Sequence, residues 1–488
     1  MTYINLNALR GRIFSAIVPI LLASCTTLGR DYEPPVIDVP DTWSGLESQW
    51  LAPDAPALAR WWRQLDEPLL DDLIEQALTR GPDLREALAR VRRARAVAGI
   101  VEGELRPALD LEASVVRRDE SDSTPFGAFA PEATTHRFGL AASWEVDLWG
   151  RVRRSIEAVE ADLDATLEDA RAVAVLVAAE TATAYVDLRA FQNRLAIART
   201  HLALQEDSLA LVRSRYEAGL VDERDVAQAA TNVEATRARV PALEIGTRRA
   251  ENRLAVLVGR APGYLGQALQ ELRALPRAPE RVAVGVPADL LRRRPDVRRA
   301  ERALAAEVAR IGVAQADLYP RLTLAGDLGL ATTRVGDLFE SDSGAWGLGP
   351  SLRWSLFDGG RLRARVEAQD ARAEEAMIAW EHTVLRALEE AENSLTSYVR
   401  GHERRRSVEA GAAQARRAVG LARTQYREGL ADFQVVLDSE RVGAELDDQV
   451  ATSDADLLAD LVALYAALGG GFGEESSPGT AGASPGNG

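Results

Sequence analysis

The stretch WEVDLWGR at residues 144–151 decides the fold, because the chain repeats it as WSLFDGGR at residues 354–361. The two copies begin 210 residues apart. The segment YEAGL, which begins at Tyr216, returns as YREGL at Tyr426, again 210 residues later. A constant offset with little identity between the copies is typical of a duplicated structural unit that keeps its lengths while its side chains drift. The sequence therefore predicts two matched halves of one shape.

Alternating apolar residues predict one β-hairpin at residues 108–148 and a second at residues 321–357. Each strand has about ten residues or slightly more, the length that crosses a bilayer when tilted. Pro350 in the last strand indicates an edge or a bulge. The landmarks Pro107 and Pro320 before the hairpins are 213 residues apart, so the second hairpin is shorter than the first.

Long helices are predicted after each hairpin. Residues 151–215 contain no Pro, no Gly and no turn cluster, and a continuous helix there would be about 100 Å long. Leu188 recurs in a seven-residue series through Leu209, which is typical of coiled-coil packing. Each long helix ends in a YxxGLxD motif, where Gly suits the left-handed position after a helix and Asp suits the N-cap of the next. We therefore expect helical hairpins over residues 151–258 and 361–468.

The N-terminus resembles that of an exported lipoprotein. Arg10 and Arg12 precede an apolar run too short to span a bilayer comfortably, which is a signal-peptide arrangement. The sequence Leu-Ala-Ser-Cys ending at Cys25 is similar to a bacterial lipobox, in which cleavage leaves the Cys as the lipidated first residue. Thr26 follows, as in lipoproteins sorted to the outer membrane. Cys25 is the only Cys, so no intramolecular disulfide is possible.

These patterns divide the chain into five parts. They are a signal peptide at 1–24, a lipidated N-terminal extended arm at 25–67, a first repeat at 68–282, a second repeat at 283–468 and a disordered tail at 469–488. Each repeat consists of a helix, a β-hairpin and a long helical hairpin, and the first also has a connecting segment after its helical hairpin.

Composition argues against several functions. The formal net charge of −16 disfavours nucleic acid as a partner. The four His residues have no metal-ligand spacing, and no Gly-rich phosphate motif precedes a helix. We therefore expect no cofactor, no metal and no enzymatic activity.

Four strands of bilayer length cannot close a barrel, and open strand edges inside lipid are prohibitive. Three copies of the chain would supply twelve strands, an even number within the usual range. The sequence therefore predicts an α+β fold in which a trimeric outer-membrane β-barrel continues into a long periplasmic α-helical coiled-coil barrel. Such an assembly is a pore.

The segments RRRPDVRRAERAL at 292–304 and IGVAQADLYPRLTL at 311–324 resemble the signature of TolC-like outer-membrane efflux channels. The lipobox and the following GRDYEPP resemble the OprM-like or NodT-type lipoprotein branch of that family. The resemblance implies a homotrimeric conduit in the outer membrane, in contact with its lipid and anchored through Cys25. It also implies a periplasmic adaptor and an inner-membrane pump of the RND type as partners, and the export of drugs or other toxic small molecules.

The resemblance also implies roles for residues at the two helix turns. The expected adaptor contacts are Gly219, Leu220, Gly429 and Leu430. The expected residues of the periplasmic gate, or constriction, are Tyr216, Asp225, Tyr426 and Asp438. Three copies of Asp438 would form an anionic ring that attracts cations. Helix capping is the alternative role for Asp222, Asp225 and Asp432.

The sequence departs from the family pattern at two positions in the second turn. Val435 stands where some members have an additional Asp, and Ala431 stands where some have a gate Arg. The closed state is therefore expected to be held differently here, with packing between Tyr216 and Tyr426 as one alternative.

Two other functions remain open at this point. The channel of a type I protein-secretion system has the same fold, and a periplasmic coiled-coil scaffold or adaptor would lack the barrel. A scaffold would form no pore in a bilayer. Adjacent pump and adaptor genes would favour efflux over secretion.

Overall fold

The computed structural model describes residues 26–44, 48–52, 54, 58–119, 121, 123 and 132–471. The chain divides into two compact units. Unit 1 comprises Met1–Val36, Val91–Thr166 and Arg299–Glu381, and unit 2 comprises Ile37–Arg90, Leu167–Arg298 and His382–Gly488. Each unit therefore contains matching pieces from both sequence repeats. The expected signal peptide and Cys25 lie outside the described residues.

The helices retain the lengths of the duplication. Helices α4 and α9 each contain 67 residues, and helices α5 and α10 each contain 35. The bounds are α2 Pro68–Arg80, α3 Pro82–Glu102, α4 Arg151–Glu217, α5 Glu223–Leu257, α6 Gly266–Leu269, α7 Pro287–Arg293, α8 Pro295–Ala316, α9 Arg361–Arg427 and α10 Phe433–Ala467, with short 3-10 helices η1 Trp61–Leu65, η2 Gly103–Leu105 and η4 Val335–Asp337. Within the described ranges, no helix combines the length and apolarity needed to cross a membrane.

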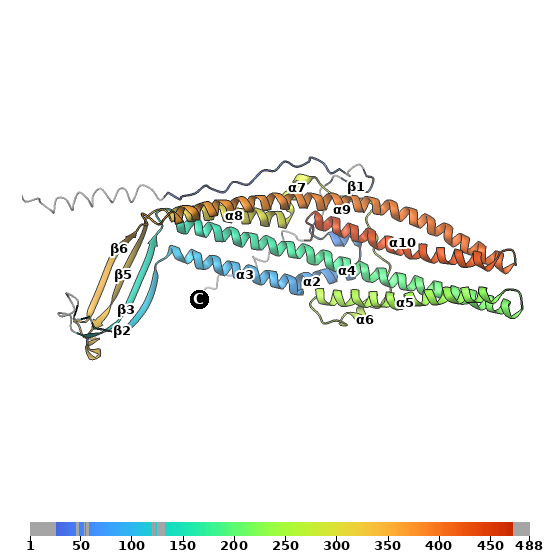
Figure 1. Ribbon diagram of the computed structural model, residues 1–488, viewed down its shortest axis with the longest axis horizontal. Helices are drawn as coiled ribbons and strands as arrows, with labels where there is room; N and C mark the ends of the chain where they lie inside the picture. The colour runs from blue at the N-terminus through green and yellow to red at the C-terminus, as the bar shows by residue number, and fades with distance from the viewer. Residues whose placement is uncertain are drawn as a thin grey trace, which may run out of the picture. The chain divides into compact units, whose positions relative to one another are not determined.

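Unit 1 contains a four-stranded antiparallel sheet (Figure 1). Its strands lie in the order β2 (Ala108–Arg118), β3 (Ala133–Val146), β5 (Arg321–Thr332) and β6 (Gly344–Arg353). Strands β2 and β6 are the two edges of the sheet, so Pro350 lies on an edge strand, as predicted. Alternate residues expose apolar side chains on one face, among them Leu109, Leu111, Val115, Trp346, Leu348 and Leu352.

The junctions between strands and helices in unit 1 repeat as well. The Trp144 indole donates a hydrogen bond to the Leu105 carbonyl at 3.0 Å, and Trp354 donates to the Leu318 carbonyl at the same distance. The two Trp residues are 210 residues apart and the two carbonyls are 213 residues apart, which are the offsets of the repeats, so the two bonds close equivalent corners.

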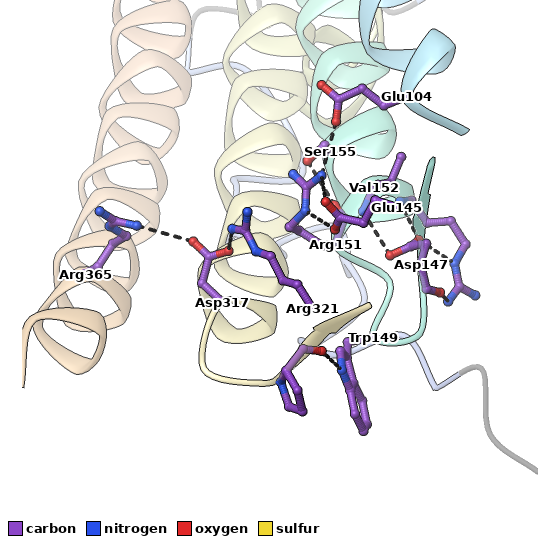
Figure 2. A network of polar contacts seen from close by, with 12 residues as sticks. Glu104, Glu145, Asp147, Trp149, Arg151, Val152, Ser155, Asp317, Arg321 and Arg365 are labelled. Atoms are coloured by element: carbon purple, nitrogen blue, oxygen red, sulfur yellow. Dashed lines mark hydrogen bonds and ion pairs between the residues drawn. The ribbon is translucent and has the colours of Figure 1, made fainter. Parts of the chain in front are cut away.

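Polar contacts fix the start of α4 at the first junction (Figure 2). The Asp147 carboxylate accepts hydrogen bonds from the backbone N–H of Val152 at 3.1 Å and of Arg153 at 3.0 Å, which satisfies two free donors of the helix N-terminus. Arg151 forms a two-pronged pair with Glu145, with distances of 2.7 and 3.0 Å. Charge-assisted bonds of this geometry are stronger than neutral ones and fix orientation.

The N-terminal arm of unit 1 is fixed at the same junction. The backbone N–H of Leu28 donates to the Trp149 carbonyl at 3.1 Å. The Arg154 guanidinium donates to the carbonyls of Leu28 and Gly29 and to the Asp31 carboxylate. A Cβ on Gly29 would lie 2.7 Å from the Gly312 backbone, so the arm approaches α8 at a distance that only Gly allows.

Unit 2 contains both helical hairpins, α4 with α5 and α9 with α10. Ion pairs bridge the first hairpin between Arg199 and Glu244 at 2.8 Å, and the second between Arg404 and Asp456 at 2.9 Å. A two-stranded parallel sheet pairs β1 (Leu51–Ala52) with β4 (Val282–Ala283). The first of these strands comes from the predicted extended arm.

The RRRPD segment has a structural role in unit 2. Arg294 donates to both oxygens of Asp296, at 3.0 and 2.6 Å, to Glu390 at 2.7 Å and to the Ala467 carbonyl at 3.0 Å. Burial alone would raise the pKa of Asp296, but the Arg294 guanidinium lowers it overall. The motif therefore joins the start of α8 to the last turn of α10.

The expectation of a disordered tail from Gly469 is wrong for its first residues. Gly469 and Gly470 donate backbone hydrogen bonds to Ala466 and Tyr465, and Gly471 donates to Leu58. All three Gly residues are buried. Gly469 has φ of +79°, the left-handed conformation in which Gly ends a helix without steric cost. Residues 472–488 lie outside the described part of the chain.

Candidate functional site at the two helix turns

The two helix turns in unit 2 have the same backbone. Gly219 and Gly429 adopt φ of +70° and +74°. In the first turn Leu220 donates to the Arg215 carbonyl at 2.9 Å, and in the second Leu430 donates to the Gln425 carbonyl at 2.8 Å. This is the Schellman arrangement, which satisfies the last carbonyls of a helix. The YxxGL motif therefore encodes one turn geometry twice.

Each turn exposes one large apolar side chain. Leu220 is 71% exposed and Leu430 is 79% exposed. The adjacent Gly residues have open space where a Cβ would be, so their φ values, and not crowding, require Gly. All four residues predicted to contact a partner are thus on the surface of this chain at equivalent positions.

The first turn is capped by Asp222. Its carboxylate accepts a hydrogen bond from the Asp225 backbone N–H at 3.3 Å. Asp432 occupies the same place in the second turn but makes no such side-chain bond. The capping role therefore belongs to Asp222, and the Asp225 side chain is available for other contacts.

Asp225 lies in an acidic neighbourhood. Burial and the Asp222 carboxylate raise the pKa of Asp225, while Arg224 opposes the rise, and Asp432 from the second turn adds to it. Arg224 reaches Asp222 at 3.4 Å and Asp225 at 3.9 Å. The carboxylates of the two turns are therefore close enough to affect one another.

The two predicted Tyr residues have different environments. Tyr426 is 3% exposed, whereas Tyr216 is 44% exposed. The Tyr426 ring centroid is 5.4 Å from that of Phe433, and the Arg215 guanidinium lies 4.4 Å from it. The structure therefore places Tyr426 in a core contributed by both hairpins and leaves Tyr216 on the surface. Within one chain the two Tyr residues therefore have different surroundings.

Burial raises the pKa of Tyr426, and the Arg215 cation opposes this rise. Its hydroxyl has no hydrogen-bond partner among the described residues. Arg215 also donates to the Arg427 carbonyl at 2.8 Å, so one side chain of the first hairpin both covers Tyr426 and holds the last turn of α9.

A buried ion pair near the second turn was not predicted from the sequence. Glu440 is 4% exposed and accepts hydrogen bonds from Arg423 at 2.7 and 2.9 Å. Ser208 of the first hairpin donates to the same Glu440 oxygen at 2.7 Å. Arg423 also donates to the Leu204 carbonyl at 3.0 Å. Glu440 and Arg423 thus connect the two hairpins.

A polar series with a spacing of seven residues runs along α4 and contacts the second hairpin throughout. Its members are Arg194, His201, Ser208 and Arg215. Their respective partners are Asp448, Asp447, Glu440 and the Arg427 carbonyl. Seven-residue spacing keeps side chains on one stripe of a supercoiled helix. The seven-residue spacing of this polar series is visible in the sequence beside the apolar series.

Asp438 lies on the exposed side of α10. Its side chain is 51% exposed and contacts Arg441 at 3.3 Å and Gln434 at 3.2 Å. Val435, three residues earlier, is 46% exposed. Positions 435 and 438 therefore present adjacent side chains on one exposed stripe of the helix.

A sheet with one apolar face and two long helical hairpins of equal length together define a TolC-like outer-membrane channel of the trimeric class, which is a conduit and not an enzyme. The chain belongs to the outer membrane efflux protein family, whose model matches residues 73–260 and 286–470. The matched regions contain both helix turns.

Two curated relatives and two solved structures illustrate the match. Nodulation protein T of Rhizobium leguminosarum bv. viciae is 32% identical over 94% of each chain, and outer membrane protein OprJ of Pseudomonas aeruginosa is 30% identical over 95% of this chain and 97% of its own. The outer-membrane channel OprN has a TM-score of 0.86 and 37% identity, covering 91% of this chain and 99% of its own. The open-state MtrE channel of Neisseria gonorrhoeae has a TM-score of 0.81 and 27% identity, covering 91% and 98%.

The protein is therefore an efflux channel of the outer membrane with a large periplasmic portion. Like other members of the family, it is one component of a system that also contains a periplasmic adaptor and an inner-membrane pump.

Proposed function

We propose that this channel exports small toxic molecules received from an RND-type pump, with three copies of the chain closing a twelve-stranded barrel. Relatives named for their cargo favour small molecules: OpmQ of Pseudomonas aeruginosa is a pyoverdine export protein, and TtgI of Pseudomonas putida is a component of a toluene efflux pump. The pump type rests on the sequence resemblance. The observation that carries the proposal is the pair of identically built helix turns, each exposing one Leu.

The exposed Leu residues are the proposed contacts with the adaptor. Leu220 and Leu430 are each largely exposed beside a Gly with open space around it. In a trimer they would form six apolar contacts of one backbone geometry, which suits a partner that binds repeatedly to the same motif. Exposed apolar side chains at fixed positions are typical of interaction surfaces.

Charging these positions tests the adaptor contact. In cells that depend on this channel, Leu220→Asp together with Leu430→Asp should abolish resistance to the exported compounds while the trimer remains in the outer membrane. The matched control is Leu385→Asp, which charges an exposed Leu of α9 more than forty residues before the second turn. Full resistance in the double variant, or equal loss in the control, would contradict the proposed contact.

The constriction is proposed to involve Tyr216, Asp225 and Asp438, with Tyr426 as a support beneath them. Asp438 and Tyr216 have exposed side chains, whereas Tyr426 is buried and can act only through packing. Three copies of Asp438 would place carboxylates around one axis and favour cations in the pore.

Ion selectivity in planar bilayers tests the role of Asp438, with one variant that removes a carboxylate from this stripe and one that adds a carboxylate. Asp438→Asn should reduce the preference for cations, and Val435→Asp should increase it, because position 435 lies on the same exposed stripe. Unchanged selectivity in both variants would remove Asp438 from the pore.

The lipid anchor at Cys25 is also a proposal. The arm is fixed from Leu28 onward at the junction of β3 and α4, and three residues of chain span about 10 Å at most. An acyl chain on Cys25 would therefore lie beside the base of the strands. Cys25→Ala should lose incorporated palmitate, and a variant that keeps the label would refute the anchor.

A further inference from the structure

The four-stranded sheet of unit 1 has two open edges, β2 and β6. Backbone N–H and C=O groups on such edges need partners in lipid, because water is absent there. In a trimeric barrel β6 of one copy must pair with β2 of the next. The internal duplication provides a rule from which the register of that pairing can be derived.

The two β-hairpins, β2–β3 and β5–β6, have the same register. Ala108 pairs with Ser143 in the first hairpin, and Arg321 pairs with Arg353 in the second. The first strands of these pairs are offset by 213 residues and the second strands by 210, the same offsets that separate the sequence landmarks. The repeats are therefore equivalent strand by strand, with no slip across the sheet.

The seam between β3 and β5 joins the first repeat to the second within one chain. Its register places Ser143 opposite Ala325 and Ala141 opposite Asp327. The seam between β6 and β2 of the next copy joins the second repeat to the first, so it is the same junction one repeat further around the barrel.

We propose that the seam between copies has the register of the β3–β5 seam, carried over by the offsets of 210 and 213. Under this rule Arg353 lies opposite Glu112 of a second copy, Ser351 lies opposite Ser114, and Trp354 lies opposite Leu111. This proposal rests on the trimeric barrel proposed above and specifies how its copies meet.

Two independent features agree with this register. The rule places Trp354 and Leu111 on the same face, so apolar side chains remain beside apolar side chains, whereas a slip by one residue would put them beside carboxylates. The rule also brings together two opposite charges at the two edges. Within the described part of the chain, neither Glu112 nor Arg353 has an ion-pair partner.

Charge alone would also accept Asp110, which lies on the same face of β2 two residues from Glu112. The duplication, and not the charge, selects Glu112. A slip by two residues is therefore the alternative that an experiment must exclude.

Cysteine pairs provide that experiment. Ser114→Cys with Ser351→Cys replaces two small residues that the rule places directly opposite each other, where Cβ atoms lie about 4.5–5.5 Å apart. The matched controls pair Ser351→Cys with Glu112→Cys or with Val116→Cys, which are two residues away on the same face. Diagonal neighbours in a sheet are about 7–8 Å apart, too far for an undistorted disulfide.

Oxidation of the full-length protein in its membrane should convert most of the Ser114→Cys/Ser351→Cys variant to covalent dimers and trimers on non-reducing gels. The controls should show at least tenfold less, and each single variant reports any bridge formed by Cys25. Cross-linking of a control pair in preference to the proposed pair would overturn the register while leaving the trimeric channel intact. If wild-type protein is monomeric in gentle detergent and no pair reacts, both the register and the proposed trimer are wrong.

Reversing charge tests the ion pair by a separate readout. Glu112→Arg and Arg353→Glu should each reduce the fraction of trimer that survives in dodecyl sulfate, and the double variant should restore it. Asp110→Arg is the matched control, and its combination with Arg353→Glu should bring no restoration. Restoration by Asp110→Arg and not by Glu112→Arg would contradict the proposal.

Discussion

The two helix turns of unit 2 have the same backbone geometry, but their side chains lie in different surroundings. Both end in a left-handed Gly and the same pair of backbone hydrogen bonds. In the second turn Tyr426 is buried on Phe433, whereas the position equivalent to Phe433 in the first turn is the exposed Glu223. The first turn therefore keeps Tyr216 and an acidic cap at the surface. Duplication thus preserved the shape of the turn while leaving its packing free to change.

The different burial of Tyr216 and Tyr426 predicts which of the two turns opens more readily. The second turn lies within a core and beside a buried ion pair. The first hairpin contributes to each of them, because its Arg215 covers the Tyr426 ring and its Ser208 donates to Glu440. Both hairpins contribute buried residues to this core, but the Tyr of the first turn is exposed where the Tyr of the second turn is buried. We expect the first turn to open more readily and the second to remain ordered.

The largest expected effect comes from removing Tyr426. Tyr426→Ala should destabilise the paired turns by about 3–5 kcal/mol, because a buried aromatic ring is replaced by a cavity. Tyr216→Ala is the matched change at the exposed position and should cost less than about 0.5 kcal/mol. Hydrogen–deuterium exchange of both turns measures the two effects, and equal effects would contradict the comparison.

Tyr426→Phe sharpens the same contrast. It removes a hydroxyl without a described partner and should leave exchange near the wild-type rate. A loss as large as that of Tyr426→Ala would show that the hydroxyl, and not the ring, holds the turn.

The next effect concerns the buried ion pair. Glu440→Ala leaves Arg423 and Ser208 without their shared acceptor and should cost about 3 kcal/mol, the lower end for a broken buried pair because Arg423 is partly exposed. Opening of residues 204–215 and 423–440 should become about a hundredfold more frequent, as read by amide exchange. Glu234→Ala removes an exposed i,i+3 pair with Arg237 and should change exchange little.

A smaller loss of stability is expected at the two Gly residues, and it should be the same at both. Gly219→Ala and Gly429→Ala should each cost about 1–2 kcal/mol, because both force a Cβ into the left-handed region without creating a clash. Thermal unfolding of each variant measures the cost. Effects that differ by more than a factor of two would mean that the turns do not share one backbone requirement.

The smallest effect is a pH dependence confined to the first turn. Because the pKa of Asp225 is raised above its usual value, the folded protein binds this proton more tightly than the unfolded chain does. Stability is therefore lost as the pH rises through the interval between the usual and the raised pKa. Asp225→Asn should raise the unfolding midpoint at pH 7 and leave it unchanged below pH 4, and the same midpoint as wild type at pH 7 would contradict this prediction.

Much of this architecture follows from local signals in the sequence. The absence of Pro and Gly over residues 151–215 predicts α4, whereas α9 contains three Gly residues and is predicted by the constant offset between the repeats. The Gly and Asp of each motif predict the turns between helices. Alternating apolar residues predict the strands, because one face of the sheet must lie in an apolar environment. These features depend on neighbours a few residues apart.

The side-chain contacts between the hairpins do not follow from such signals. Ser208 and Glu440 are 232 residues apart, and nothing local to either one indicates the other. The same motif contains an exposed Tyr216 and a buried Tyr426, and only the contrast between Glu223 and Phe433 distinguishes them. Predicting that contrast requires knowing that the two hairpins share a core.

We propose that the contacts that Arg215 and Arg423 make between the two hairpins help to hold the periplasmic end of the channel closed. Single-channel conductance in planar bilayers tests it with the double variant Arg215→Ala and Arg423→Ala, against Arg237→Ala as an exposed control. We expect a several-fold higher open conductance for the double variant and wild-type behaviour for the control. Wild-type conductance in a correctly assembled double variant would contradict it.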